Sequence, residues 1–346
     1  MLARLAASPD IYPQRIDLSS LMVLLVQFDA DAYRRASFLD DRIVTPATVG
    51  AWAGLDKVAE ESRRVRDARP VHFIFHTGHV GSTLVSRLLD ETGFVLSLRE
   101  PLPLRTLAEA HDAAGRIDAL LSGDEFDRNV AMLMRLWSRG YQATRSVVIK
   151  ATSSAGRLAA TLLSASEVSR AIYLNLRAEP YLATLLAGQN SPTDLRGHGP
   201  ERMRRLASRT GSALTPLHSL SLGELAAMSW LAESWSQRDA LKQFPTRIIG
   251  LDFDRFLESV GPSIGGILGH FGLPAEGRQL EALGRSSVLT RYSKAPEFAY
   301  TPNVRAELLR DSRRRNSDQI RRGMAWLERM AASDDAVADI VTGSGS

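Results

Sequence analysis

Short apolar runs alternate with longer amphipathic stretches over most of the chain from residue 71 onward. Each run is rich in Val, Ile, Leu and Phe, as buried strands are, and a helical pattern of apolar positions follows it. Parallel strands joined by crossover helices are covered on both faces of their sheet. The alternation therefore predicts an α/β three-layer sandwich with a five-stranded parallel sheet, its strands expected at residues 71–75, 94–98, 146–149, 171–176 and 247–253.

Two stretches between the expected strands are longer than simple crossovers. Residues 105–139 and 179–244 have helical periodicity, and we expect helical inserts that cover a substrate site. Residues 1–70 are expected to form a mostly helical N-terminal extension. Near the other end, Thr301 and Pro302 are typical of a helix start and predict a long helix to about residue 332. The expected organisation is thus one phosphate-loop domain, 71–332, followed by a C-terminal tail, 333–346.

The first expected strand continues into a glycine-bearing turn and then a helix, in the sequence VHFIFHTGHVGSTLVSRLL of residues 71–89. Gly78 and Gly81 allow the backbone to approach an anion, and the helix from Ser82 adds its positive N-terminal dipole. The hydroxyls of Ser82 and Thr83 can donate further hydrogen bonds. In the ATP-binding consensus a glycine stands where His76 is and a lysine where Ser82 is, which weakens an ATPase or kinase interpretation. A tight turn without a ligand is the alternative.

The loop resembles that of the sulfotransferase superfamily, in which a basic residue stands two places before Gly-Ser/Thr-Ser/Thr. Gly81, Ser82 and Thr83 match this pattern, and His79 occupies the place of the basic residue. The resemblance covers about residues 70–330 and implies a bacterial-type transferase with sheet order 2-3-1-4-5. It also implies the donor 3′-phosphoadenosine 5′-phosphosulfate (PAPS), bound through Gly78, Gly81, Ser82 and Thr83, with His79 near the leaving group and no required metal.

The same resemblance assigns a 3′-phosphate clamp to the end of the fourth strand. An arginine ends this strand in the family, and a hydroxyl lies about two turns into the next helix. Arg177 matches the arginine, whose planar guanidinium suits a phosphate. Thr184 matches the hydroxyl, although it follows Arg177 by one residue fewer than is usual in the family. The alternative for Arg177 is an ordinary ion pair with Glu179.

Two residues at neighbouring strand ends are candidates for chemistry. Glu100 follows the second strand, and Lys150 ends the third, at the edge where open α/β sheets bind ligands. The resemblance gives Glu100 the role of general base for the acceptor and Lys150 that of a cation at the transferred group. The alternatives are a surface ion pair of Glu100 with Arg99 or Arg105, and a lysine at position 150 without a function.

The chain has 39 arginines and four lysines, so each lysine stands out. Lys294 lies with Arg291 in the segment 291–297, where the resemblance predicts a basic loop that closes over the nucleotide. We therefore add Arg291 and Lys294 to the candidate cofactor-binding residues.

Composition and charge exclude several functions. No cysteine is present, which removes disulfides, thiolate metal sites and cysteine nucleophiles. The histidines at 72, 76 and 79 lie on an expected strand and loop, which does not orient them like the i, i+4 pair of a helical zinc site, and no carboxylate accompanies them in the local motif. The net charge of +4 and the arginine runs near residues 313–322 favour a solvated helix face, with no nucleic acid partner. No apolar run approaches the length of a membrane span, so a cytoplasmic protein is expected.

These observations lead to one prediction and two alternatives. The predicted function is a sulfotransferase-like transfer from PAPS to a hydroxyl or amine of a small-molecule or carbohydrate acceptor, with a homodimer left open. The alternatives are a phosphate-loop kinase that uses ATP and magnesium, and a family member that binds a nucleotide or anion without turnover.

Overall fold

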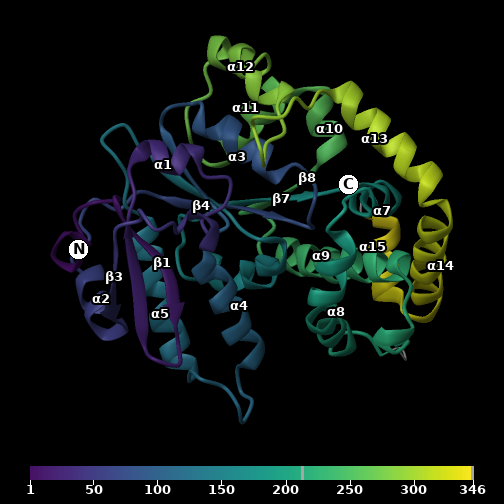
Figure 1. The fold of residues 1–346 in the computed structure, drawn as a ribbon, viewed down its shortest axis with the longest axis horizontal. Coiled ribbons are helices and arrows are strands. Elements are labelled where there is room, and N and C mark those ends of the chain that lie inside the picture. The colour runs from purple at the N-terminus through teal and green to yellow at the C-terminus, as the bar shows by residue number, and fades with distance from the viewer. Residues whose placement is uncertain (212–213, 344–346) are drawn as a thin grey trace.

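The computed structural model describes residues 1–211 and 214–343. Its centre is a parallel sheet of five strands in the order β5-β6-β4-β7-β8 (Figure 1). This order confirms the prediction, because the strands number 2-3-1-4-5 along the chain from residue 71. The strands are β4 (Val71–His76), β5 (Val95–Arg99), β6 (Ser146–Lys150), β7 (Ala171–Asn175) and β8 (Ile248–Asp252).

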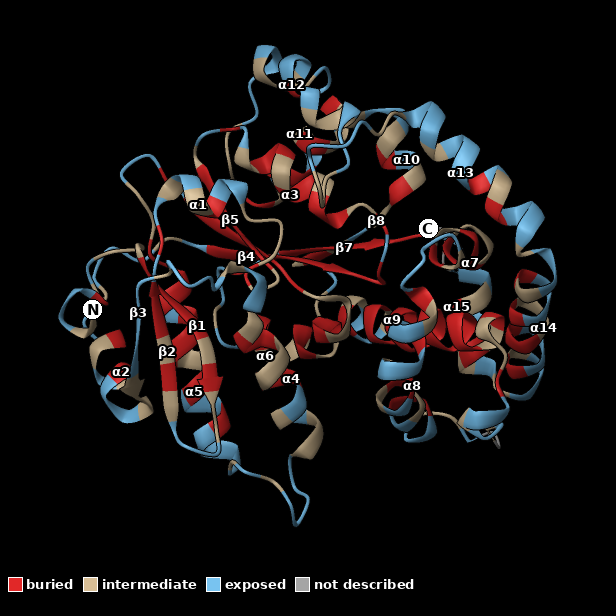
Figure 2. Ribbon diagram, viewed as in Figure 1, coloured by how far each residue is buried: buried red, intermediate tan, exposed pale blue. Residues whose placement is uncertain are grey.

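The sheet separates two apolar cores, as the alternation of side chains along a strand requires. Ile74 of β4 faces one core, while Phe73 and Phe75 face the other. Every residue of β4, β5, β6 and β7 is buried, whereas the edge strand β8 is more accessible (Figure 2). The carboxyl ends of β4, β5 and β6 are therefore buried, with His76, Arg99 and Lys150 as their last residues.

Helices cover both faces of the sheet and fill the two predicted inserts. The first insert holds α4 (Leu102–Ala113) and α5 (Gly123–Trp137), and the second holds α7 (Ala178–Leu186), α8 (Ser191–Ala207) and α9 (Leu222–Gln243). The remaining helices of the sheet domain are α3 (Ser82–Asp90), α6 (Ala159–Ser164), α10 (Phe253–Glu258), α11 (Val260–His270) and α12 (Gly277–Leu283).

The prediction of a mostly helical N-terminal extension is wrong. Residues 1–70 form an antiparallel sheet of β1 (Ile11–Asp17), β2 (Met22–Gln27) and β3 (Gly50–Gly54), with short helices α1 (Ala30–Arg35) and α2 (Leu55–Ser62). Asp17 makes the β1–β2 turn, since its carboxylate accepts hydrogen bonds from the amides of Ser19 (2.9 Å) and Ser20 (3.2 Å). Short apolar runs fit either a helix or a strand, and here they bury their residues by strand pairing. We call residues 1–70 the N-terminal module.

The helix predicted from Thr301 to about residue 332 is interrupted. Thr301 caps α13 (Pro302–Arg315), as expected, but the chain breaks at Asn316 before α14 (Ser317–Ser333). The Asn316 amide donates to the carbonyl oxygen of Leu186 at 3.2 Å, which ties the break to the end of α7. Part of the segment predicted as a C-terminal tail is helical instead: α15 (Asp335–Gly343) follows α14 and buries Val337.

No helix within the described residues is long and apolar enough to cross a membrane. The arginines of α13 and α14 form ion pairs on an exposed face, for example Arg313 with Glu179 at 2.8 Å. This confirms the prediction of a solvated face. The tryptophans at 137, 230, 235 and 326 are buried in the apolar cores.

Candidate functional site

The loop between β4 and α3 adopts left-handed backbone at three positions. Gly78 has φ 102° and Gly81 has φ 71°, while His79 has φ 53° without being glycine. A Cβ atom at Gly81 would collide with the ring of Phe253, which packs against the loop from the start of α10. Position 81 therefore requires glycine for its backbone angle and for this contact. A strained non-glycine residue such as His79 is typical of a functional loop.

His76 holds the loop on the sheet as a neutral residue. Its Nδ1 atom accepts a hydrogen bond from the amide of Gly78 at 3.1 Å, so its Nε2–H donates to the carbonyl oxygen of Ala151 at 2.8 Å. Burial of the ring, helped by the charge of Lys150, lowers the pKa of His76 well below its ordinary value. A histidine therefore replaces the first glycine of the ATP-binding consensus and joins β4 to the chain after β6.

The first turn of α3 offers donors to an anion. Gly81 is the N-cap and supplies no side-chain cap, and the first amides of a helix have no acceptor within that helix. Thr77 and Thr83 are buried, and within the described residues their Oγ1 atoms have no hydrogen-bond partner. Buried hydroxyls are ordinarily paired. This concentration of unpaired donors suits the oxygens of a phosphate or sulfate group.

Glu100 and Lys150 form an ion pair at the ends of β5 and β6. The Lys150 ammonium donates to Oε1 of Glu100, and the exposed fractions of the two side chains are 1% for Lys150 and 14% for Glu100. Burial lowers the pKa of Lys150, although the Glu100 carboxylate opposes that effect. The structure thus joins two residues that the sequence placed only on neighbouring strands. Within the described residues Glu100 forms no ion pair with Arg99 or Arg105, so the first alternative does not apply.

The backbone at Glu100 is strained and is held by hydrogen bonds on both sides. Its φ of 52° lies in the left-handed region, and its amide donates to the carbonyl oxygen of Lys150 at 2.6 Å. Leu39 of the N-terminal module forms hydrogen bonds with the chain on both sides of Glu100. Its amide donates to the carbonyl oxygen of Arg99 (2.6 Å), and its carbonyl oxygen accepts from the amide of Leu102 (3.2 Å). Such a conformation persists where the surroundings enforce it, and it aims the carboxylate at Lys150.

The N-terminal module also supplies an aromatic ring to the site. The Lys150 and Lys294 ammonium nitrogens lie 5.8 Å and 5.9 Å from the centroid of the Phe38 ring, and the Arg42 guanidinium carbon lies 3.5 Å from it. Arg42 is paired with Asp40. These distances are within the range of cation–π attraction, so Phe38 gathers positive charge beside Glu100. Sequence analysis missed Phe38 and Arg42, because no local motif marks them.

His79 does not take over the charge of the basic residue that it replaces. Burial of the ring is the largest cause that lowers the pKa of His79 to about 4, and the positive charges of Lys294 and Lys150 lower it further. Solvent reaches this side chain, so the effect of burial is weaker than for His76. The charges of Lys294 and Lys150 act in the same direction as burial and lower the pKa, although the Asp194 carboxylate opposes them. Lys150 and Lys294 are the nearby cations instead.

The residues expected at the 3′-phosphate clamp are only partly arranged for it. Arg177 is exposed at the end of β7, and within the described residues its guanidinium has no ion-pair partner. Glu179, its alternative partner, pairs with Arg313. The Thr184 hydroxyl donates to the carbonyl oxygen of Pro180 at 2.7 Å, so it is engaged within α7. Arg291 is exposed and joins the Lys294 loop to Ala299 through a backbone bridge.

The three clustered histidines are separated by their partners. The rings of His72 and Phe271 stack at a centroid distance of 4.6 Å, and Nδ1 of His72 accepts from the amide of Arg170. His76 is bound to the loop backbone. Over the residues that the structure describes, no group of three or more His, Asp and Glu is arranged to hold a metal ion.

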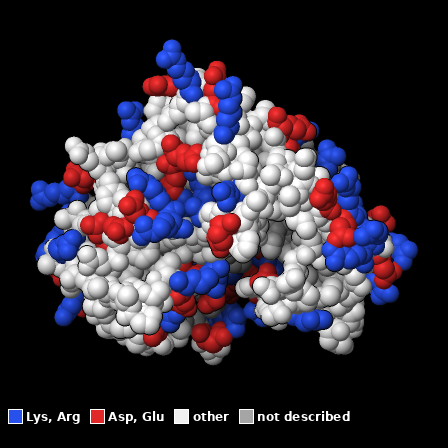
Figure 3. Space-filling view, turned by 45° about the horizontal axis from the view of Figure 1, so that its top comes forward, with Lys and Arg blue, Asp and Glu red and all other residues white. Residues whose placement is uncertain are grey.

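Figure 3 shows Lys and Arg side chains gathered near the middle of one face of the molecule, with Asp and Glu side chains among them.

No protein-family model and no curated protein matches the chain. Among solved structures, it is similar to the sulfotransferase domain of the curacin biosynthetic pathway, with 15% identity over 69% of this chain and 86% of that one and a TM-score of 0.38. It is also similar to mouse sulfotransferase SULT7A1 complexed with PAP, with 10% identity over 79% of this chain and 89% of that one and a TM-score of 0.42. For sulfotransferase STF9 of Mycobacterium avium the identity is 12% over 91% of this chain and 95% of that one, with a TM-score of 0.36. At such identities and TM-scores these likenesses carry no inference about chemistry.

Proposed function

We propose that this chain transfers a sulfuryl group from PAPS to a hydroxyl or amine of a small acceptor. The observation that carries the proposal is the ion pair of Glu100 and Lys150 at the sheet edge next to the anion-binding loop. One side chain can take a proton from the acceptor, and the other can stabilise negative charge on the transferred group.

The donor end of the site fits an anionic ligand. The first-turn amides of α3 and the unpartnered hydroxyls of Thr77 and Thr83 would hold the phosphosulfate oxygens. Lys150 and Lys294 supply charge there, since His79 is neutral. Arg177 is available for a 3′-phosphate, whereas Thr184 is not unless its hydroxyl rotates away from Pro180.

The reaction is an in-line displacement at sulfur. The acceptor oxygen or nitrogen forms a bond to sulfur while the bond between sulfur and the bridging phosphate oxygen breaks. The electron pair of the broken bond goes to the phosphate, which leaves as part of adenosine 3′,5′-bisphosphate, and the acceptor proton goes to the Glu100 carboxylate. Loop amides and Lys150 would stabilise the charge that spreads over the sulfuryl and bridging oxygens.

The pairing of Lys150 with Glu100 has a consequence for this proton transfer. A carboxylate that is bound to an ammonium is a weaker base than a free one, because the charged form is stabilised. We infer that the anionic donor draws Lys150 toward its bridging oxygen and thereby frees the carboxylate for the acceptor. Donor binding would then activate the base.

A second candidate function is binding of an anionic nucleotide without turnover. The neutral His79 and the engaged Thr184 hydroxyl favour it, because both lie where the family resemblance expects groups that act on the donor.

Ligand-induced thermal stabilisation tests the donor site first. We expect adenosine 3′,5′-bisphosphate to raise the melting temperature more than AMP or ATP with magnesium does. Equal stabilisation by all three would contradict the PAPS proposal, and preference for ATP with magnesium would support a kinase.

Transfer from labelled PAPS to phenolic, alcohol, amine and carbohydrate acceptors then tests catalysis. Glu100→Gln should keep bisphosphate binding and slow transfer by about 10²–10⁴-fold. Glu91→Gln, at an exposed position after α3, is the matched control and should be fully active. Bisphosphate binding without transfer to any acceptor would favour the non-catalytic alternative.

A further inference from the structure

The sheet of the N-terminal module has one free edge. β1 at the opposite edge packs against α4 and α5, whereas Gly50, Ala51 and Trp52 of β3 are exposed. Soluble proteins commonly protect such edges with lysine, proline or a bulge. The sequence Gly-Ala-Trp-Ala-Gly of β3 contains none of these.

Alternate backbone groups of β3 point away from β2. The Leu55 amide donates to the carbonyl oxygen of Leu21, and the Val49 carbonyl oxygen accepts from the amide of Gln27, both at 2.8 Å. The backbone N–H and C=O groups of the odd-numbered residues between Val49 and Leu55 therefore point toward β2. The N–H and C=O groups of Gly50 and Trp52, and the N–H of Gly54, therefore point outward. Among the described residues, these groups make no backbone hydrogen bond to another element.

We propose that β3 pairs with β3 of a second copy of this chain, antiparallel about a two-fold axis at Trp52. The strand reads the same in both directions from Trp52, with Ala51 matching Ala53 and Gly50 matching Gly54. The two Trp52 residues exchange N–H to C=O hydrogen bonds across the axis, and each Gly54 N–H donates to Gly50 of the other copy. A two-fold contact of this kind uses the same surface on both copies and closes the assembly at a dimer.

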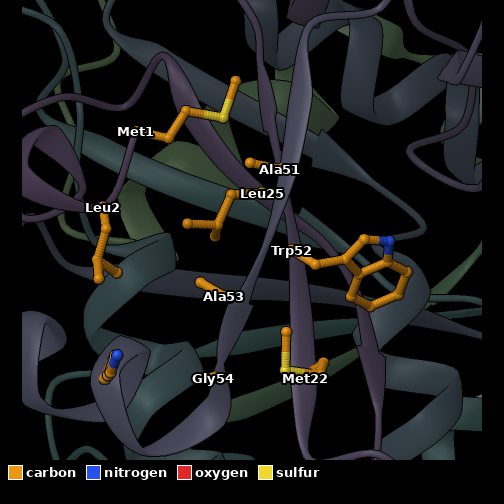
Figure 4. Close-up of a pocket in the computed structure, with 9 residues that line it drawn as sticks. Met1, Leu2, Met22, Leu25, Ala51, Trp52, Ala53 and Gly54 are labelled. Atoms are coloured by element: carbon orange, nitrogen blue, oxygen red, sulfur yellow. The ribbon is translucent and has the colours of Figure 1, made fainter.

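The side chains at this edge agree with the pairing. Trp52 is 48% exposed, and Figure 4 shows its indole projecting to the opposite side of β3 from Leu25 and Leu2. Residues directly opposite each other in an antiparallel pair share a face, so the two indoles meet and shield the half-buried Met22. A cavity of about 510 Å³ with a mainly apolar lining lies along the same edge.

Charge and symmetry favour a second copy as the occupant. The five positions of β3 hold no charged side chain, so self-pairing sets no like charges opposite each other. An edge peptide from another protein could use the same backbone groups, but the mirror symmetry of the strand about Trp52 would have no role in it.

Cross-linking tests the register, and the absence of native cysteine makes each introduced thiol unambiguous. Trp52→Cys should form a disulfide-linked dimer under mild oxidation, because position 52 faces itself across the axis. Ala51→Cys is the control: position 51 faces position 53, so its own thiols are too far apart to join. Equal cross-linking of both variants, or none at position 52, contradicts the proposed pairing.

Sedimentation of the cysteine-free protein tests the dimer itself. The wild type should shift from monomer to dimer over a dilution series. Trp52→Pro removes the outward amide without touching the bonds to β2, and should be monomeric, whereas Trp52→Thr keeps the amide and should dimerise more weakly. A wild type that stays monomeric at all concentrations, or a dimer that persists in Trp52→Pro, overturns the proposal.

Discussion

The ammonium of Lys150 and the carboxylate of Glu100 form a nearly buried ion pair that joins the ends of two adjacent parallel strands. Residue 100 has a left-handed backbone, and its amide bonds to the carbonyl of residue 150. The pair is therefore held by both a backbone and a side-chain interaction.

The two charges should be strongly coupled. Lys150→Met leaves the Glu100 carboxylate without its partner and should lower the free energy of unfolding by roughly 3–5 kcal/mol. The double variant Lys150→Met with Glu100→Gln should lose less than the sum of the single variants, with a coupling of about 0.5–3 kcal/mol from urea unfolding. Additive losses would show that the pair contributes nothing to stability.

Gly81 should tolerate no side chain. Gly81→Ala combines a left-handed alanine with a collision with Phe253, and should lower the free energy of unfolding by roughly 2–5 kcal/mol. Gly115 has a similar φ of 77°, but a Cβ there meets nothing within 4 Å. Gly115→Ala should therefore cost about 1–2 kcal/mol by chemical denaturation. Equal losses would mean that the Phe253 contact yields easily.

The protein should lose stability in mild acid through His72. Burial, followed by the charge of Arg170, lowers the pKa of this histidine to about 4. The unfolded chain thus binds more protons than the folded one between about pH 6.5 and pH 4, and stability falls as the pH falls through this window.

For His72 alone the loss amounts to roughly 3 kcal/mol. His72→Gln should flatten the dependence of the urea midpoint on pH, and the exposed His218→Gln should leave its slope unchanged. An unaltered slope in His72→Gln would assign the acid sensitivity to other groups, such as His76.

Arg99 should anchor the N-terminal module to the sheet. Its guanidinium pairs with Asp90 and donates to the carbonyl oxygens of Tyr33 and Ala36, each at 2.9 Å. Arg99→Met should lower the free energy of unfolding by about 3–5 kcal/mol, because a nearly buried carboxylate loses its partner. Limited proteolysis after residue 36 should also accelerate. The exposed Arg34→Met is the control, and equal cleavage of both variants would contradict an anchoring role.

Local pattern predicted the sheet, its strands and the glycine-bearing loop between β4 and α3. The reason is that buried parallel strands and a strand-loop-helix turn need particular residue types over a few consecutive positions, such as Phe73 to Phe75 and Gly78 to Thr83. The same pattern placed Glu100 and Lys150 at strand ends. It did not predict the N-terminal module, where short apolar runs fit a helix or a strand equally well until they find partners.

What the sequence by itself determined is the α/β class, the strand order through the family resemblance, the loop after the first strand, and the places of Glu100 and Lys150 at two strand ends. Tertiary structure alone decided that Lys150 pairs with Glu100, that the pKa values of His76 and His79 are lowered, and that Phe38 reaches the site from the N-terminal module. Ion pairing and pKa shifts arise from burial and from neighbours that lie far apart in the chain, and no local pattern encodes those distances.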